Sequence, residues 1–257
     1  MKYLLLILFW SFQCQAALEK IKLLLPTDRT IYESTIYHFG GEETFLRRFY
    51  EGNGKNIEKT VDAILATLDF REKYQLFEKE VTYSDIEQEI SSSWCSRYPG
   101  YSLDGHAIGY TQLSRLNPKE LLSKYSEDQI EQFYVKWLEI GLALQRGTEI
   151  DGVYEVYDLK GLGIRQFSKT NINLVKKLIS IALKHYPEHL AIGSIVNMPR
   201  VGRIAWGLVS KILDSDTKLK IRMIDREVES NLIDLFGSEQ KYRDVMKSMN
   251  SEPNLYQ

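Results

Sequence analysis

The sequence of 257 residues is poor in the residue types that mark several large protein classes. Two cysteines and six prolines indicate neither a disulfide framework nor a proline-rich linker. No run of lysine and arginine exceeds two residues and the net charge is −2, so the basic surface that nucleic-acid binding requires is missing. What remains is 44% hydrophobic and 26% charged, which is typical of a globular chain long enough to bury a core.

The first sixteen residues differ from the rest. Lys2, the apolar run 3–12 and Cys14-Gln15-Ala16 resemble a secretory signal peptide that is removed before Ala17. The run is too short to span a bilayer, and an amphipathic or buried N-terminal helix is the alternative. Cleavage would leave Cys95 as the single cysteine, so no intrachain disulfide could form. We therefore treat residues 1–16 as a separate N-terminal segment.

The remaining chain divides by its apolar periodicity. Apolar residues recur at spacings of three and four between Glu42 and Tyr74, which predicts a helical N-terminal subdomain over residues 42–80. The stretch 84–100 is polar and is interpreted as a connection. Residues 98–235 then alternate strands with helices, and 236–257 are expected to form a C-terminal helix and a loose tail.

The alternating region predicts a specific order of elements. Strands are expected at 106–113, 153–161, 190–196 and 218–224, and helices at 130–142, 171–184 and 201–213. Thr170 is the expected cap of the second helix, and Pro187 stops it. The last strand is expected to alternate Leu219, Ile221 and Met223 with Lys218, Lys220 and Arg222. This order indicates an α/β fold with a sheet flanked by helices.

Motifs for catalysis are weak. The sequence Gly161-Leu162-Gly163 lacks the third glycine of a dinucleotide site, because Gln166 occupies its place. His185 and His189 have Pro187 between them and cannot share one helical face as metal ligands. No metal, cofactor or catalytic residue is therefore predicted, and a non-enzymatic role is favoured.

The expected helix 201–213 is apolar around most of its circumference. Such a helix is either fully buried or covers an apolar ligand. Burial in an ordinary core is the simpler interpretation from the pattern alone.

Two proline motifs frame the strand before this helix. The chain reads Tyr186-Pro187-Glu188, then Ile195-Val196-Asn197-Met198-Pro199, then Trp206. Together with Asp104-Gly105 and Asp158-Leu159-Lys160-Gly161, this spacing resembles the CRAL-TRIO domain of phosphatidylinositol-transfer and related lipid-carrier proteins. The resemblance runs from about Glu43 to Asp225.

The resemblance implies a CRAL-TRIO lipid-binding fold, in which a gate helix closes an apolar pocket between the sheet and the helices. It places Tyr-Pro-Glu at the end of a helix at the pocket edge, the strand 190–196 in the pocket floor, and Asn-Met-Pro at the turn into the gate. The implied pocket and gate residues are Val201, Ile204, Ala205, Leu208, Val209 and Ile212.

Three further positions resemble those that hold a phosphoinositide headgroup, namely Glu188, Thr217 and Lys220. A carboxylate suits the inositol hydroxyls, while an ammonium and a hydroxyl suit the phosphate. A structural ion pair between Glu188 and Lys220 is the alternative. Lys218 and Arg222 could form a basic edge toward anionic membrane lipids, or be solvated strand charges.

The sequence also departs from the family. Val153 and Glu155 replace the Ser and Thr of phosphatidylcholine-binding members, which disfavours a choline lipid as the second ligand, and Glu155 in the pocket would repel a phosphate. The hypothesis is a monomeric lipid carrier that holds one phospholipid as cargo, most simply phosphatidylinositol, and touches membranes transiently. It is expected in the cytoplasm and at membrane surfaces, or in the secretory pathway if residues 1–16 act as a signal peptide. Carriage of a retinoid, tocopherol or sterol-like molecule, and a non-transferring interaction module, are the alternatives.

Overall fold

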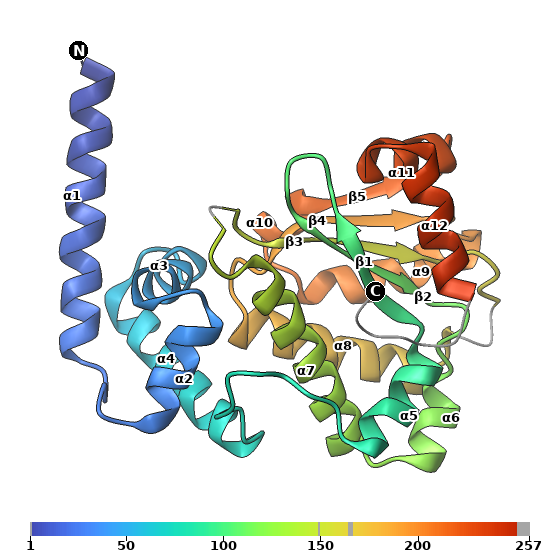
Figure 1. The fold of residues 1–257 in the computed structure, drawn as a ribbon, viewed down its shortest axis with the longest axis horizontal. Helices are drawn as coiled ribbons and strands as arrows, with labels where there is room; N and C mark the ends of the chain where they lie inside the picture. The colour runs from blue at the N-terminus through green and yellow to red at the C-terminus, as the bar shows by residue number, and fades with distance from the viewer. Residues whose placement is uncertain (1, 149, 164–166, 251–257) are drawn as a thin grey trace. The chain divides into compact units, whose positions relative to one another are not determined.

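The computed structural model describes residues 2–148, 150–163 and 167–250, and the chain divides into two compact units (Figure 1). The first unit contains residues 1–81 and the short segment Lys184–Glu188. The second contains Thr82–Leu183 and the residues from His189 onward. In the described ranges no helix combines the length and the apolar character needed to cross a membrane.

The first unit is helical. It comprises α1 (Lys2–Leu23), α2 (Thr30–His38), α3 (Glu42–Gly52) and α4 (Ile57–Lys73). Helix α1 runs through the expected cleavage point, and the buried side chains of Ala17, Leu18 and Ile21 lie in its second half, which packs against α3 and α4. The expected subdomain 42–80 lies within this unit, which also contains α2.

Aromatic rings fill the core of the first unit. Phe39, Phe45 and Phe49 contact one another with centroid separations of 5.0–5.8 Å. Tyr186 stacks on Phe39 at 6.2 Å and is 3% exposed. The Tyr-Pro-Glu motif was expected at a pocket edge, but its tyrosine belongs to this helical core.

His185 anchors the same segment. Its Nδ1 lies 2.9 Å from the Thr67 hydroxyl, and its ring stacks on Phe70 with centroids 3.9 Å apart. Burial, with smaller contributions from Lys184 and Arg71, lowers the pKa of His185 to about 3. The imidazole is therefore neutral in the folded protein under ordinary conditions.

The second unit is an α/β layer. Its strands are β1 (Ser96–Tyr101), β2 (Ala107–Gln112), β3 (Val153–Asp158), β4 (Leu190–Val196) and β5 (Ile221–Ile224), in the spatial order β1-β2-β3-β4-β5. Strand β1 is antiparallel to β2, and the other neighbours are parallel. The helices are α5 (Asp85–Trp94), α6 (Pro118–Lys124), α7 (Glu127–Gln145), α8 (Lys169–His185), α9 (Arg200–Val209), α10 (Ser215–Lys220), α11 (Val228–Phe236) and α12 (Glu239–Asn250), and the 3-10 turn η2 (Ser210–Ile212) follows α9.

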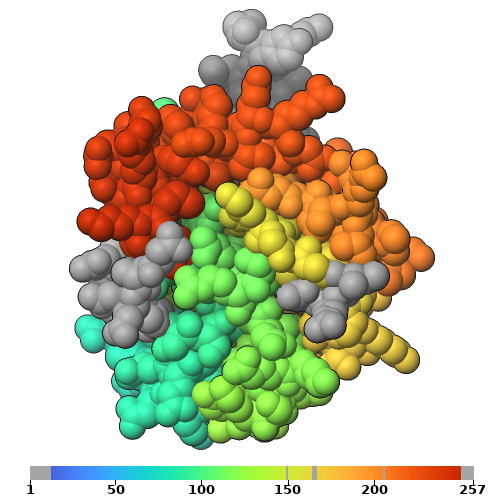
Figure 2. All heavy atoms as spheres, turned by 90° about the vertical axis from the view of Figure 1, so that its right-hand side faces the viewer, coloured from blue at the N-terminus to red at the C-terminus, as the bar shows by residue number. Residues whose placement is uncertain are grey.

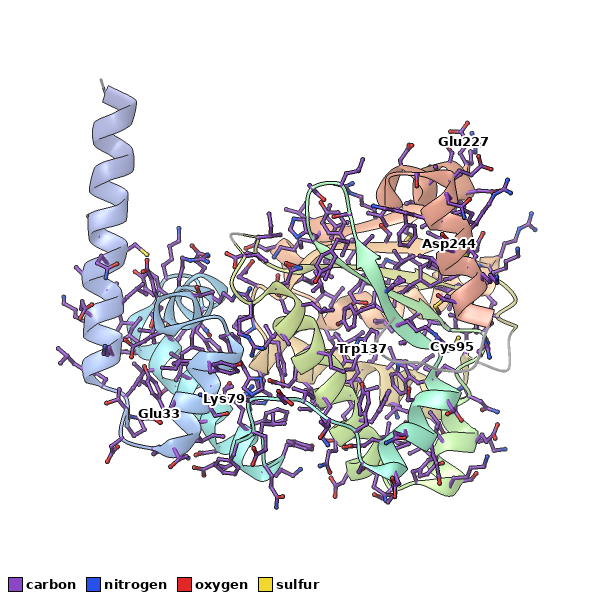
Figure 3. All side chains as sticks on the ribbon, viewed as in Figure 1. Glu33, Lys79, Cys95, Trp137, Glu227 and Asp244 are labelled. Atoms are coloured by element: carbon purple, nitrogen blue, oxygen red, sulfur yellow. The ribbon has the colours of Figure 1, made fainter. Side chains whose placement is uncertain are left out.

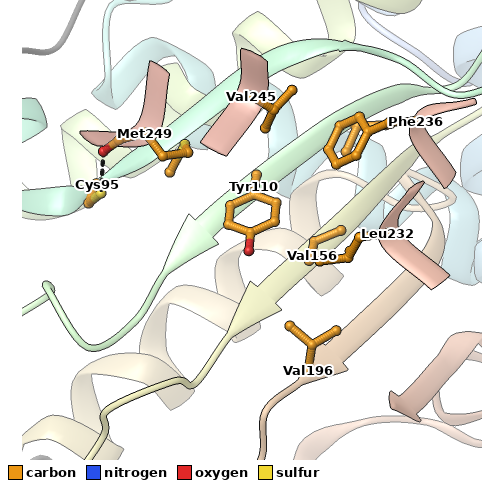
Figure 4. Packing of buried hydrophobic residues seen from close by; sticks show 9 residues of the cluster. Cys95, Tyr110, Val156, Val196, Leu232, Phe236, Val245 and Met249 are labelled. Carbon is orange, nitrogen blue, oxygen red and sulfur yellow. Dashed lines mark hydrogen bonds between the residues drawn. The ribbon is translucent and has the colours of Figure 1, made fainter. Parts of the chain in front are cut away.

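Helices cover both faces of the sheet (Figure 1). Tyr110 and Val156 point toward α11 and α12, where they pack with Leu232 and Phe236 (Figure 4). Ile108 belongs to the same buried cluster. On the side of the molecule shown in Figure 2, the red atoms of α11 and α12 lie above the green atoms of the middle of the chain. Helices α7 and α8 connect parallel neighbours in the sheet and lie on the opposite face. The pocket that the resemblance implies would lie on this second face.

Most expected elements are confirmed, and three local expectations are wrong. The stretch 84–100, read as a connection, contains α5 and β1; Ser84 and Glu87 form a capping box at the start of α5. The Ser168 hydroxyl, not Thr170, accepts from the Asn171 backbone at the start of α8. Residues 215–220 are helical because the Asp214 carboxylate accepts from the Thr217 backbone and caps α10, so the last strand begins only at Ile221.

We predict that His185 makes the protein sensitive to mild acid. The unfolded chain binds a proton at His185 below about pH 6.5, whereas the folded chain binds it only below about pH 3. The contribution of the neutral His185 to folding stability is therefore complete above about pH 6.5 and is lost as the pH falls below that value. Between pH 7 and pH 5 the loss from this group is about 2 kcal/mol. Urea unfolding should show that His185→Gln loses less stability than wild type over this interval. Equal losses in the two proteins would contradict the assignment.

Candidate functional site

The turns at the carboxyl ends of β3 and β4 are joined by one carboxylate. Asp158 Oδ1 accepts from the Asn197 side-chain amide and from the Lys160 backbone N–H, each at 2.8 Å. Asp158 Oδ2 accepts from the Tyr110 hydroxyl at 3.0 Å. Asn197 has a φ of +55°, so a short polar side chain suits the turn that leads to Pro199 and α9. The two sequence motifs, Asp-Leu-Lys-Gly and Asn-Met-Pro, therefore form one structural junction.

Helix α9 follows this junction and is amphipathic. Ile204 is 72% exposed and Leu208 is 40% exposed, while Val201, Val209 and Ile212 are half-buried. The side chain of Ala205 lies outside the described part of the structure. The expected helix 201–213 thus ends earlier as an α-helix, at Val209, and continues through η2. Full burial of this helix is excluded, because large apolar side chains reach its surface.

The three expected headgroup residues come from both units. Glu188 belongs to the first unit, is half-buried and has a φ of +54°. Thr217 and Lys220 lie on α10 of the second unit, one turn apart, and both are half-buried. The Thr217 hydroxyl donates to the Asp214 carboxylate at 2.8 Å. A headgroup that binds Thr217 would have to share or replace that bond.

The expected basic edge lies on two different elements. Lys218 is exposed on α10, whereas Arg222 is exposed on β5. Between residues 200 and 226 the chain has seven basic and three acidic residues, in a protein of net charge −2. Leu219, at 83% exposed, and Met223, at 41%, lie among these charges. The segment combines positive charge with exposed apolar side chains.

Glu155 lies on the sheet face that α7 covers, opposite the face of Val156. In the sheet register Glu155 pairs with Gly109 of β2 and Gly193 of β4. A β-carbon at Gly109 would lie 2.5 Å from the Glu155 carboxylate, so glycine is needed for the carboxyl group to lie over β2. Glu155 is 5% exposed, and burial raises its pKa to about 8. The carboxyl group is therefore mostly protonated at neutral pH in this structure.

Aromatic side chains surround this carboxyl group. The Tyr98 hydroxyl on β1 lies 3.5 Å from Glu155 Oε1, and the Tyr98 ring stacks on Trp137 with centroids 4.1 Å apart. Figure 3 labels Trp137 on α7. Desolvation, followed by the charge of Glu155, raises the pKa values of Tyr98, Tyr134 and Tyr157. Each of these three tyrosines is nevertheless only half-buried.

A different hollow, of about 180 Å³, lies beside α5 and α6. It is lined by Ser92, Ser93, Arg115, Asn117, Glu120, Leu121 and Lys124. Lys124 pairs with Glu120 at 2.8 Å within this lining. The lining is mostly polar and does not match the apolar pocket that the sequence predicts.

No group of three His, Cys, Asp or Glu side chains within the described ranges is arranged to hold a metal ion. Cys95 is buried at the start of β1, and burial raises the pKa of its thiol, which disfavours a thiolate nucleophile.

Residues 91–244, more than half of the chain, match the CRAL/TRIO domain family. The chain belongs to the CRAL/TRIO family. A crystal structure of Sfh5 has the same fold, with a TM-score of 0.57 and 20% identity over 77% of this chain and 67% of that one. The α/β fold expected from the sequence is thereby confirmed.

Curated CRAL/TRIO relatives are similar at low identity. "Protein real-time" of Aedes aegypti is 26% identical over 68% of this chain and 28% of its own length. The phosphatidylinositol/phosphatidylcholine transfer proteins SFH7 and SFH13 of Arabidopsis thaliana are 23% and 25% identical over 61% and 76% of this chain, and over 30% and 33% of their own lengths. The chain spans about a third of the length of these relatives.

Sequence reasoning missed part of the CRAL/TRIO interior. Tyr98 lay in the stretch that was read as a connection, and Tyr134 and Trp137 were read only as one face of an amphipathic helix. A signal was available in Gly109 and Gly193, since a glycine within an apolar strand often marks a close approach by another group. Glu155 was identified, but its glycine neighbours became evident only from the register.

We predict that Gly141 is required for the contact between α7 and the sheet. An alanine β-carbon there would lie 2.5 Å from the Tyr98 hydroxyl and 2.9 Å from His189 Cε1, and stacking on Trp137 restricts Tyr98. Gly141→Ala should destabilise the protein by about 1–3 kcal/mol, despite the better helix propensity of alanine. Gly207→Ala is the matched control, because nothing lies within 4 Å of that position, and it should be neutral or stabilising by up to about 1 kcal/mol. Urea unfolding that ranks the two variants in the opposite order would exclude this packing.

Proposed function

We propose that this protein binds a single phospholipid, phosphatidylinositol, in the interior of the second unit and exchanges it between membranes. The observation that carries the proposal is α9, an amphipathic helix with exposed Ile204 and Leu208 that follows the Asp158–Asn197 junction in a chain of the CRAL/TRIO family. Relatives named as phosphatidylinositol/phosphatidylcholine transfer proteins support lipid as the ligand class.

The proposed mechanism is physical. Displacement of α9 at a membrane opens the interior of the second unit, and acyl chains enter because burial stabilises each methylene by about 0.8 kcal/mol. The gate consists of Val201, Ile204, Ala205, Leu208, Val209 and Ile212. On return of α9 the apolar chains are shielded from water, so a lipid monomer can cross the aqueous phase.

The phosphate of the headgroup is assigned to Thr217 and Lys220 of α10, whose hydroxyl and ammonium groups are suitable hydrogen-bond donors. Glu188, which belongs to the first unit, is kept separately as the residue that the family resemblance suggests for the inositol hydroxyls. Lys218 and Arg222 add positive charge outside the site, which favours contact with an anionic bilayer. The protein acts at the membrane surface as a monomer.

Native mass spectrometry of the full chain, followed by lipid extraction, tests the central proposal. A stoichiometric phosphatidylinositol is expected, either co-purified or acquired from mixed liposomes. A protein that stays empty after incubation would overturn it and favour an interaction module.

Lys220→Ala should weaken binding of dioctanoyl phosphatidylinositol about tenfold, because one charge-assisted hydrogen bond of about 1.5 kcal/mol is lost. Isothermal titration calorimetry without vesicles separates headgroup binding from membrane contact. Lys218→Ala, an exposed change on the same helix, is the control and should leave the affinity unaltered. Unchanged affinity in Lys220→Ala would assign Lys220 a structural role.

Ile204→Asp should reduce sedimentation with phosphatidylserine-containing vesicles about tenfold, because the side chain no longer enters the apolar part of the bilayer. Ile86→Asp, on α5, is the matched control, since Ile86 is also an exposed isoleucine on a helix of the same unit. Equal loss of binding in the two variants would exclude α9 as the membrane-contacting helix.

A further inference from the structure

Glycines flank Glu155 on both neighbouring strands of the sheet. Gly109 and Gly193 flank Glu155 in the register, so no side chain stands beside it on either neighbouring strand. A β-carbon at Gly193 would lie 2.5 Å from Ile221 Cδ1. Over Gly109, the approaching group is the Glu155 carboxyl itself. A single acidic group therefore marks the centre of this face.

The carboxyl group has little to bind within the protein. Its one hydrogen-bond partner in the described structure is the Tyr98 hydroxyl, at the long distance of 3.5 Å. The Tyr134 and Tyr157 hydroxyls have no hydrogen-bond partner among the described residues, although the charge of Glu155 contributes to raising their pKa values. A carboxyl group that is 95% buried and so weakly bonded is costly unless a ligand completes it.

The chemistry of the surroundings selects the ligand. Three phenol oxygens and one carboxyl group are all able to accept hydrogen bonds, and the rings of Tyr98, Tyr134, Tyr157 and Trp137 offer electron-rich faces. No lysine or arginine is among the groups that shift the pKa of Glu155. A phosphate would be buried here without a cation, whereas an ammonium group would gain an ion pair and cation–π contacts.

We infer that Glu155, with Tyr98, Tyr134 and Tyr157, forms a site for the ammonium group of a long-chain amine that carries no phosphate. The inference rests on the proposed lipid-binding function, and names a second class of cargo that occupies the interior in place of phosphatidylinositol. The alkyl chain lies in the apolar space and the ammonium group contacts the Glu155 carboxylate.

Binding is coupled to release of one proton. The carboxyl group of the empty protein is protonated at neutral pH, while the ammonium complex requires the carboxylate. The observed affinity should therefore rise roughly 50-fold from pH 6 to pH 8 and level off above that. The titratable groups coupled to Glu155 are Tyr98 of β1, Tyr134 of α7 and Tyr157 of β3; Tyr83 is coupled to Tyr98, and His189 lies beside Tyr98 near Gly141. His189→Gln is the control that removes the imidazole.

The test compares three probes of equal chain length by calorimetry, namely dodecylamine, dodecanol and dodecanoate, below their aggregation concentrations. Wild type should bind the amine at least tenfold more tightly than the alcohol, with proton release measured in buffers of different ionisation enthalpy. Glu155→Gln, which is isosteric, should lose this preference and the pH dependence while it still binds dodecanol.

Tyr157→Phe supplies a second variant in case Glu155→Gln does not fold. It should lower amine affinity about threefold to tenfold without affecting the alcohol. Tyr154→Phe is its control, because Tyr154 lies on the opposite face of the same strand and donates to Asp104. Equal binding of the three probes, or a preference that survives Glu155→Gln, would overturn the ammonium assignment alone. Absence of binding by all three would overturn the lipid-binding proposal and this inference with it.

Discussion

The carboxylate of Asp158 is the interaction on which the second unit depends most. It accepts hydrogen bonds from the Asn197 side-chain amide, the Lys160 backbone N–H and the Tyr110 hydroxyl, and Asp158 is only 8% exposed. Three donors on a buried carboxylate offset the cost of removing it from water, which a single donor would not do. The same group therefore fixes the end of β3, the end of β4 and the direction in which the chain enters α9. In the proposed mechanism α9 moves from this fixed origin, so the sheet keeps its order when the helix is displaced.

The order of secondary structure was accessible from the sequence where periodicity was strong. The alternation in 106–112 and the apolar run 190–196 predicted strands that the structure confirms. The helix 215–220 was missed because its residues alternate apolar and basic as a strand would, while the deciding contact is the cap from Asp214. Strand β1 was missed because Pro99 and Gly100 read as a turn, although Pro is tolerated at the edge of a sheet. In both places local contacts, rather than the apolar pattern of the sequence, determined the secondary structure.

The candidate site was predictable only in part, for a geometric reason. The sequence pattern predicted Asp158 near the end of one strand, Asn197 after the next strand and a helix after Pro199, and the structure has these elements at those places. The environment of Glu155 depends on which residues of β2 and β4 lie beside it, and register between distant strands cannot be read from one strand. It also depends on Gly141, whose missing side chain lets Tyr98 approach α7. A glycine in the sequence shows that no side chain is present at that position, but the sequence does not show which neighbouring group fills the space.

Two parts of the second unit thus differ in charge. The exposed segment 200–226 is positive and suits an anionic surface or headgroup, whereas the floor beside β3 carries an acid and no basic neighbour that shifts its pKa. An ionised Glu155 would repel a phosphate placed at depth, so the proposed phosphoinositide would keep its phosphate near α10 and place its acyl chains beside β3. The pKa of Glu155 is about 8, so the carboxyl group can be neutral or charged near neutral pH. Changing its protonation state costs about 1.4 kcal/mol for each pH unit away from that pKa. With the proposed function, this interior would distinguish ligands by the depth at which they carry their charge rather than by the size of their apolar part.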